Sequence, residues 1–215
     1  MEGSLCPPDD PDFCVIETLA FRPQNGLVRR DRHLRRMART AAVLGLRFDR
    51  ARALQVLDGI GGSTPLRCRL TLAADGALTV TTGPLPDNPP VWQVSIAATR
   101  LTSRDVWLQH KTSERSLYDI ARAALPSGID EWIFLNEKQE LCEGTITNLF
   151  LNLPGGGLLT PGLSSGVLPG VLREELIDNK QVTEATLTLT DLQAAEFVYV
   201  GNSLRGLIRA ELANL

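Results

Sequence analysis

A proline-rich segment divides this sequence into two parts. "GPLPDNPP" (83–90) places four prolines within eight residues, a density that neither a helix nor the interior of a sheet accommodates. Strand and helix patterns lie on both sides of this segment, and 215 residues are enough for two domains. We therefore predict a linker at 86–92 between a small N-terminal α+β lobe at 13–85 and a larger C-terminal lobe at 93–215.

The lead-in and the composition limit the class of protein. Residues 1–12 are acidic and proline-rich without an apolar run, so we expect a disordered lead-in and not a signal peptide. A net charge of −3 gives no general attraction to nucleic acid or to an anionic membrane. The apolar runs are far shorter than the roughly 20 residues that span a bilayer. Four scattered cysteines and only two histidines argue against a structural zinc site and fit a reducing cytoplasm.

The N-terminal lobe combines strand and helix patterns. Residues 12–21 are rich in β-branched and aromatic side chains and predict a strand, which the hairpin-forming "RPQNG" follows. A helix is then predicted from Asp31, which can cap it, to Gly45, which can end it. Its apolar residues at helical spacing are Leu34, Met37, Ala41 and Leu44. The other predicted elements of this lobe are a helix from Asp49 to about Leu57 and a β-hairpin at 66–82.

The C-terminal lobe contains more strand patterns than helix patterns. A helix is predicted at 113–125, with Ser113 as its cap. The stripe that this helix should bury consists of Leu117, Ile120, Ala121 and Ala124. A second helix is predicted within "PGVLREELIDN". The predicted strands are "VWQVSIAAT", "EWIFLN", "ELCEGTITNLFL", "LLT" and "EFVYVGNS".

Lys111 is an unusual residue type for its position. The chain has 22 Lys plus Arg but only three lysines, of which Lys138 and Lys180 lie in polar turns. Lys111 instead precedes the predicted helix, whose partial positive charge should disfavour an ammonium group and lower the pKa of the lysine. A neutral amine can attack an aldehyde, which an arginine cannot do. The alternative is an exposed loop cation.

Two further features suit a pyridoxal phosphate cofactor, which needs a carboxylate at its ring nitrogen and a site for its phosphate. Glu143 lies in the apolar stretch "LCEGTITNLF", where an unpaired buried carboxylate would be costly. Its alternative is an edge position that faces solvent. Gly166 and Gly170 precede a predicted helix in "SSGVLPGVLREEL", so that loop can bind phosphate. "GNSLRG" (201–206) is a second candidate anion contact.

Arg36 is not distinguished by its local sequence. It lies with Arg32, Arg35 and Arg39 on the face opposite the apolar stripe, which predicts a solvated face. Val43, seven residues later, hints that this flank is covered.

The order of these motifs resembles the fold-type IV (class IV) pyridoxal-phosphate aminotransferases. The resemblance runs from about residue 13 to 210, and its motifs are "IETLAF", "RHLRRM", "KTSERSLYDIARA", "DEWIFLNEKQELCEGTITNLF", "LLTPGLSSGVLPGVLR" and "VYVGNSLRG". It implies a two-lobed α+β fold like that of D-amino acid aminotransferase, a cofactor between the lobes, and pairing into homodimers.

The resemblance also implies a role for each candidate site residue. Lys111 would be the catalytic residue that binds pyridoxal phosphate covalently, and Glu143 would hold its pyridine nitrogen. Arg36 would bind the phosphate. The other phosphate contacts implied are the backbone of Val171 and Leu172, together with Asn202 and Ser203. Several relatives have a tyrosine where this chain has Ser116, so Tyr118 or Arg115 would take over that substrate contact, and Arg205 and Arg104 are further candidates for substrate carboxylates.

Within this family the sequence looks most like 4-amino-4-deoxychorismate lyase, because of its compact beginning and "GNSLRG". That enzyme gives p-aminobenzoate and pyruvate in folate biosynthesis, and the resemblance implies a functional link to an aminodeoxychorismate synthase. One alternative is a class IV aminotransferase that acts on branched-chain or D-amino acids. Another is a binding protein that kept the fold and lost catalysis.

Overall fold

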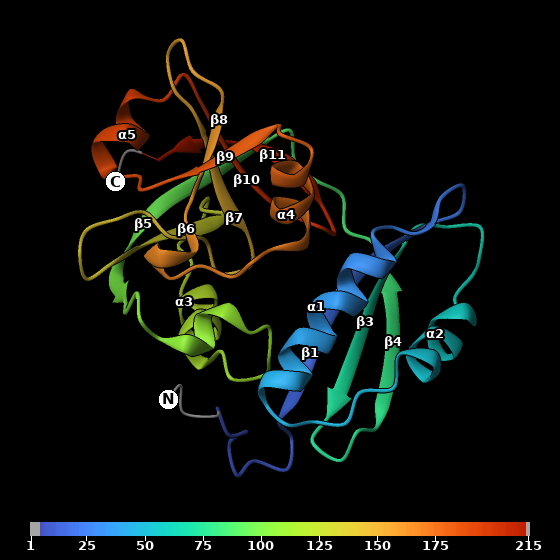
Figure 1. Cartoon of the computed structure of the whole chain (residues 1–215). Coiled ribbons are helices and arrows are strands. Elements are labelled where there is room, and N and C mark those ends of the chain that lie inside the picture. Colours follow the sequence, from blue (N-terminus) through green and yellow to red (C-terminus); the bar gives the residue numbers. More distant parts are fainter. Residues whose placement is uncertain (1–4, 214–215) are drawn as a thin grey trace. The chain divides into compact units, whose positions relative to one another are not determined.

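The computed structural model describes residues 5–213, which form two compact units (Figure 1). The first unit comprises the chain up to Asp87 together with His110–Glu114, and the second comprises Asn88–Gln109 and the chain from Arg115 onward. The segment that carries Lys111 thus belongs by its contacts to the first unit, whereas the sequence assigned it to the C-terminal lobe. Of the predicted lead-in at 1–12, the first four residues lie outside the described residues, and the rest form no helix or strand.

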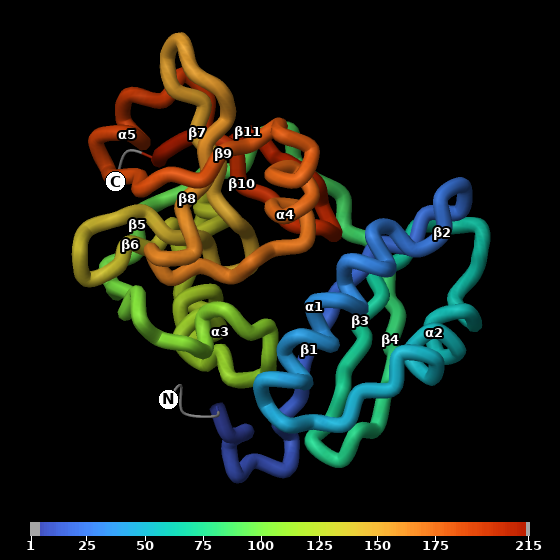
Figure 2. The backbone as a smooth tube through the Cα atoms, in the orientation of Figure 1, coloured from blue at the N-terminus to red at the C-terminus, as the bar shows by residue number. Residues whose placement is uncertain are grey.

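An antiparallel four-stranded sheet with the order β2-β1-β3-β4 is the core of the first unit. Buried side chains alternate along its third strand, at Cys68, Leu70 and Leu72, as a sheet with one covered face requires. Both predicted hairpins are confirmed. Figure 2 shows β2 returning beside the end of β1, where Gly26 has a φ of 67° that glycine tolerates. The bounds are β1 Cys14–Arg22, β2 Gly26–Leu27, β3 Leu66–Ala73 and β4 Leu78–Pro84.

Two helices cover this sheet, α1 (Arg30–Val43) against β1 and α2 (Arg50–Asp58) against β4 (Figure 1). The predicted apolar stripe of the first helix is confirmed, since Leu34, Met37 and Ala41 are buried. Val43 is 46% exposed, so the flank near it is not covered as predicted.

The capping residues predicted for these two helices are confirmed only in part. Asp31 was expected to cap α1, but the cap position is Arg29 in a left-handed conformation, and Asp31 pairs with exposed Arg50. Asp49 does cap α2, because its carboxylate accepts from the Arg52 N–H at 3.0 Å. Gly45 follows α1 with a φ of 67°, as predicted.

A buried ionic cluster ties α1 to β1. The Glu17 carboxylate on β1 is fully buried and accepts from Arg36 Nε at 2.8 Å and from Arg36 Nη2 at 2.6 Å. His33 Nδ1 contacts the same carboxylate. Burial alone would raise the pKa of Glu17, but the charge of Arg36 and the bonds from Arg36 and His33 lower it to about 2. Burial lowers the pKa of His33, so a neutral imidazole can donate its Nδ1–H to Glu17.

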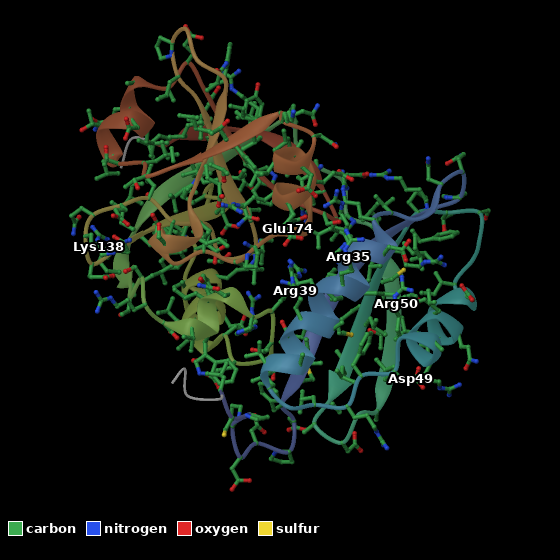
Figure 3. The ribbon with its side chains drawn as sticks, in the orientation of Figure 1. Arg35, Arg39, Asp49, Arg50, Lys138 and Glu174 are labelled. Carbon is green, nitrogen blue, oxygen red and sulfur yellow. The ribbon has the colours of Figure 1, made fainter. Side chains whose placement is uncertain are left out.

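This cluster explains why Arg36 differs from the arginines around it. Arg35 and Arg39 are exposed on the same helix (Figure 3), whereas Arg36 is 4% exposed. The solvated-face reading therefore fails at Arg36, because Glu17 on the neighbouring strand compensates its charge.

The second unit contains a mixed seven-stranded sheet with the order β6-β5-β11-β10-β7-β8-β9. Its central strands pair in antiparallel fashion, and parallel pairs flank them. The α+β class predicted from the sequence is confirmed. The bounds are β5 Val91–Leu101, β6 Glu131–Asn136, β7 Asn148–Asn152, β8 Leu158–Pro161, β9 Val182–Ala185, β10 Phe197–Asn202 and β11 Gly206–Leu212.

The long strand predicted across "ELCEGTITNLFL" is interrupted. Only Asn148–Asn152 forms a regular strand, and isolated bridges join Leu135 to Leu141 and Glu143 to Asn148. Between the last two residues the chain makes a turn, closed by a bond from the Gly144 N–H to the Thr147 carbonyl at 2.8 Å. This turn, residues 144–147, recurs in the site described below.

The helices of this unit are α3 (Ser116–Ala123), α4 (Val171–Asp178) and α5 (Leu189–Ala194), with short 3₁₀ turns at Val106–Gln109 and Leu163–Ser165. The predicted buried stripe of the 113–125 helix is wrong. None of the residues of α3 is fully buried, and Ile120 is 70% exposed. The side of α3 that touches the core carries Ala121, which belongs to that stripe, and Tyr118, which does not. Within residues 5–213, no helix is long and apolar enough to cross a membrane.

We predict that Glu17→Gln lowers the free energy of unfolding at pH 7 by about 3–5 kcal/mol, because the buried Arg36 charge loses its partner. The control Asp31→Asn breaks an exposed carboxylate–arginine pair of the same unit and should cost less than about 1 kcal/mol. Urea unfolding measures both. Equal losses of unfolding free energy in the two variants would contradict the stabilising role of the Glu17–Arg36 pair.

The same cluster sets a pH dependence. The folded-state pKa of Glu17 lies below its ordinary value of 4.5, so the stability that it contributes is complete above 4.5 and is lost as the pH falls toward about 2. The lowered pKa of His33 acts in the same direction below 6.5. The gap in stability between the wild type and Glu17→Gln should therefore shrink between pH 5 and pH 3, whereas the Asp31→Asn gap stays small throughout.

Candidate functional site

Glu143 is buried and held by three donors of the second unit. Its side chain is 5% exposed, which excludes the solvent-facing alternative. Oε1 accepts from the Tyr118 hydroxyl at 2.8 Å, and Oε2 accepts from Asn148 Nδ2 at 3.1 Å and from the Leu168 N–H at 3.0 Å. An ionised carboxylate accepts hydrogen bonds only, so this set of donors fits a charged Glu143 in a fixed orientation.

Tyr118 acts on Glu143 as a donor. Its ring packs edge-on against Phe134 with centroids 5.5 Å apart. Burial, then the charge of Glu143 and the hydrogen bond to it, raise the pKa of Tyr118 well above 10. The hydroxyl therefore stays protonated and orients the carboxylate. The sequence had suggested a substrate contact for this tyrosine, and its hydroxyl is directed at Glu143 instead.

Asn148 joins Glu143 to the glycine-containing loop 166–170. Its Nδ2 donates both to Glu143 and to the Leu168 carbonyl, at 3.1 and 3.0 Å. A Cβ at Gly170 would lie 1.8 Å from Asn148 Oδ1, so only glycine permits this approach. Gly166 has a φ of 85°, and a Cβ there would lie 2.9 Å from the Ser103 Cα. The two glycines thus bring the loop against the Glu143 region.

The loop leads into the N-terminus of α4, which can bind an anion. Gly170 is the cap residue and supplies no side-chain hydrogen bond to the first turn. Val171 and Leu172 are buried, and the partial positive charge of a helix start favours a phosphate there. Gly201 on β10 approaches the same helix, since a Cβ there would lie 3.2 Å from Leu172 Cδ2.

Asn202 uses its side chain to connect β10 with the turn 144–147. Its Nδ2 donates to the Ile146 carbonyl at 3.0 Å, and its Oδ1 accepts from the Leu204 and Arg205 N–H groups at 3.0 and 2.9 Å. Ser203 is 7% exposed next to it. Glu143, the loop 166–170, the start of α4 and Asn202 therefore form one connected region, called here the acid–loop site. Its carboxylate and its helix N-terminus suit a ligand that carries a protonated ring nitrogen and a phosphate.

Three arginines gather around the same turn. Arg115 Nη2 donates to the Thr145 carbonyl at 3.0 Å, and Arg122 Nη1 donates to Thr145 Oγ1 at 3.0 Å. Burial, followed by the charge of nearby Arg122, lowers the pKa of Arg205. The Arg205 guanidinium lies 5.2 Å from the centre of the Trp92 ring and donates to Asn88 Oδ1 at 2.8 Å. Arg104, the other candidate from the sequence, is exposed.

Lys111 lies on an extended segment that pairs with the start of β1 in the first unit. Its carbonyl accepts from the Ile16 N–H at 2.8 Å, and an isolated antiparallel bridge joins Thr112 to Val15. The charge of Lys111 is close enough to His33 to lower the pKa of that histidine, after the larger effect of burial. Lys111 is thus close to the cluster that holds Arg36.

The helix-dipole argument for Lys111 does not apply. The helix α3 begins at Ser116, five residues after the lysine, and the effect of a helix end is confined to its first turn. Ser113, the predicted cap, bonds instead to the Cys14 N–H through its Oγ at 2.9 Å. Lys111 lies near His33 of the first unit instead.

The predicted residues fall into two sets. Lys111 and Arg36 belong to the first unit. The second unit carries Glu143, Val171, Leu172, Asn202, Ser203, Arg115, Tyr118 and Arg205. Sequence reasoning missed Glu17, Glu131, Asn148 and Arg122. Glu17 could have been found by the argument that drew attention to Glu143, since it interrupts an apolar strand pattern, whereas Glu131 stands at the start of one.

Metal and disulfide chemistry find no support in the part of the chain described. Among residues 5–213 no group of three or more His, Cys, Asp or Glu side chains could hold a metal ion. All four cysteines lie within these residues, and none forms a disulfide.

Comparisons with known proteins bear on the family and the fold of this chain. The family model for amino-transferase class IV matches residues 14–212. A solved structure of a candidate amino-acid aminotransferase from Mesorhizobium loti is 44% identical, with a TM-score of 0.88 over 94% of this chain and 100% of that chain. The 4-amino-4-deoxychorismate lyase of Pseudomonas aeruginosa is 24% identical, with a TM-score of 0.79 over 93% of this chain and 82% of that chain, and supports the fold.

Among curated proteins, the aminodeoxychorismate lyase of Vibrio harveyi is 31% identical over 120 residues. That match covers 53% of this chain and 44% of the relative, so this chain spans less than half of that protein. The match to the family model, in contrast, extends over nearly the whole chain and both units. The resemblance predicted from the ordered motifs is confirmed: the chain belongs to the amino-transferase class IV family of enzymes.

Proposed function

We propose that this protein is a pyridoxal-phosphate-dependent 4-amino-4-deoxychorismate lyase that releases p-aminobenzoate and pyruvate in folate biosynthesis. The observation that carries the cofactor assignment is the acid–loop site, in which Glu143 and the start of α4 are held by Asn148 and the loop 166–170. The lyase assignment is supported by the relative from Vibrio harveyi and by the arginines around Thr145.

The cofactor residues have separate tasks in this proposal. When bound, pyridoxal phosphate supplies an aldehyde that captures amines and a protonated ring that withdraws electrons. Glu143 keeps the ring nitrogen protonated, and Tyr118 and Asn148 keep Glu143 in place. The N–H groups of Val171 and Leu172 bind the phosphate, with Asn202 and Ser203 beside them. The family resemblance assigns Arg36 to the phosphate as well, and within the first unit its guanidinium is fixed by Glu17.

Lys111 is the catalytic residue in this proposal. Its ε-amino group would hold the cofactor until the 4-amino group of the substrate displaces it, and the freed neutral amine would then remove the proton from C4 of the substrate ring. The enolpyruvyl ether bond breaks as the ring becomes aromatic, and Lys111 returns a proton to yield pyruvate. One amine thus serves as nucleophile, base and acid, which a guanidinium cannot do.

The arginines provide a reason for a substrate with more than one carboxylate. The candidates for carboxylate contacts from the sequence were Arg104, Arg115 and Arg205. The last two lie near the turn 144–147 together with Arg122. Guanidinium groups bind carboxylates in paired hydrogen bonds, and neighbouring cations favour an anionic ligand. Aminodeoxychorismate carries two carboxylates.

An aminotransferase is the second candidate, because the protein from Mesorhizobium loti is 44% identical over nearly the whole chain. In that case Lys111 moves a proton between the substrate Cα and the cofactor, and branched-chain or D-amino acids are the substrates.

For the lyase, we expect a cytoplasmic homodimer that works with an aminodeoxychorismate synthase.

A two-substrate assay separates the candidates. We expect purified protein with pyridoxal phosphate to convert aminodeoxychorismate to p-aminobenzoate, which chromatography detects. The same protein should produce no ketoacid from an amino acid and 2-oxoglutarate. Ketoacid formation without p-aminobenzoate would overturn the lyase in favour of the aminotransferase. A protein that remains colourless with pyridoxal phosphate would leave only the non-catalytic binding protein.

Lys111→Ala should abolish covalent attachment of the cofactor. Borohydride reduction of the wild type should fix the pyridoxyl group on the peptide that contains Lys111, and mass spectrometry should find none on the variant. Lys138→Ala, in an exposed turn of the second unit (Figure 3), is the matched control and should retain the label. A label at another lysine of the wild type would disprove the assignment.

Arg205→Ala should raise the KM for aminodeoxychorismate roughly 10-fold, since a charged hydrogen bond contributes about 1.5–3 kcal/mol, while the affinity for pyridoxal phosphate changes little. Arg104→Ala removes an exposed arginine and should leave both constants unchanged. Steady-state kinetics and a cofactor titration measure the two effects. Equal KM values in the two variants would remove Arg205 from the substrate site.

A further inference from the structure

We propose that Glu131 is a positioning residue of the acid–loop site, whose ionised carboxylate fixes the turn 144–147. This inference rests on the proposed binding of pyridoxal phosphate and adds to it a residue that would touch neither cofactor nor substrate. Glu131 is the first residue of β6 and is fully buried. A charged side chain at such a position requires compensation from its surroundings.

The turn supplies most of that compensation. The Glu131 carboxylate accepts from the Thr145 N–H at 3.0 Å, the Ile146 N–H at 3.2 Å and Thr147 Oγ1 at 3.1 Å. Thr145 Oγ1 donates to it as well. Three consecutive residues are thus bound to one side chain from another strand, so the conformation of the turn depends on that side chain.

Gly144 makes room for this arrangement. A Cβ there would lie 2.7 Å from the carboxyl carbon of Glu131 and 2.5 Å from Thr147 Oγ1. The φ of Gly144 is not in the left-handed region. Glycine is therefore needed here because of the close approach and not because of the backbone conformation. Glu131 and Gly144 therefore fit one another, and a change at either should move the turn.

The outer side of the turn faces the groups proposed to bind ligand. The Thr145 carbonyl accepts from Arg115, and the Ile146 carbonyl accepts from Asn202, each at 3.0 Å. The residues that flank the turn are Glu143 and Asn148, which an isolated bridge pairs. Glu131 therefore acts on the pyridine-nitrogen residue Glu143 and on Asn202 through the same four residues.

The charge of Glu131 matters because its partners are all donors. The Trp132 N–H at 3.1 Å and Arg122 Nη1 at 3.4 Å complete the set. A glutamine of the same size would place an NH₂ group against N–H donors that have no acceptor to offer it. The loss would fall on the turn, since backbone N–H groups of the turn cannot rotate away.

The test compares Glu131→Gln and Gly144→Ala with Leu192→Ala. Leu192 is a buried residue of α5 in the core cluster of the second unit against which Ile146 also packs, and its truncation lowers stability but removes no hydrogen bond between Glu131 and the turn. Thermal unfolding of each variant gives the loss of stability. Fluorescence titration gives the Kd for pyridoxal phosphate, and hydrogen–deuterium exchange of the cofactor-free protein reports the amides of residues 144–148.

We expect Glu131→Gln and Gly144→Ala each to weaken pyridoxal phosphate binding roughly 10-fold, the cost of unpaired buried donors, and to speed exchange at Thr145 and Ile146. The double variant should lose less than the product of the two single losses, because both disrupt the same contact. Leu192→Ala should leave the Kd and the turn amides unchanged.

A Kd for Glu131→Gln within twofold of that for Leu192→Ala would overturn the proposal. So would wild-type exchange rates at the turn amides of Glu131→Gln. If the wild type itself binds no pyridoxal phosphate, the proposed function fails together with this extension of it. If the wild type and Glu131→Gln both bind pyridoxal phosphate with the same Kd, only the role of Glu131 fails and the proposed function stands.

Discussion

Burying a carboxylate is unfavourable unless hydrogen-bond donors replace the water around it, and three carboxylates among residues 5–213 are buried in that way. Glu17 in the first unit, and Glu131 and Glu143 in the second, are each 5% exposed or less. Each is surrounded by donors from elements distant in sequence. Because an unsatisfied buried charge is so costly, these carboxylates impose a single arrangement on the groups that bond to them. The candidate site consists largely of those groups.

Each of the three buried carboxylates has a different role in the candidate site. Glu143 is the one proposed to meet the cofactor, and Tyr118 and Asn148 hold it from two sides. Glu131 holds the turn that follows Glu143 in the chain. Glu17 fixes the guanidinium of Arg36 against β1. In each case the polar group proposed for ligand binding is held by a partner that the ligand does not need to touch, which preorganises the site before anything binds.

The sequence was informative where one residue determines local structure. The Asn-Gly and Asp-Gly turns, the stripe with Leu34 and Met37, and the proline-rich segment all correspond to features of the structure, because backbone preference and helical periodicity act over a few residues. The predictions failed where a distant partner decides. Arg36 has the same local pattern as Arg35 and Arg39, and only Glu17 on another strand makes it a buried residue. Ile120 has the spacing of a core residue, but its side chain is exposed. The Lys111 assignment came from ordered motifs, and its local helix argument did not hold.

The pairing of residues 110–114 with β1 makes the first unit discontinuous in sequence. Ile16 and Cys14 satisfy backbone groups through Lys111 and Ser113, which come after the chain has already entered the second unit. A fragment that stops at the proline-rich segment would therefore lack both the lysine and the backbone partners of the first strand. An engineered exchange of the N-terminal sheet between relatives has to carry the short stretch around residue 111 along with it.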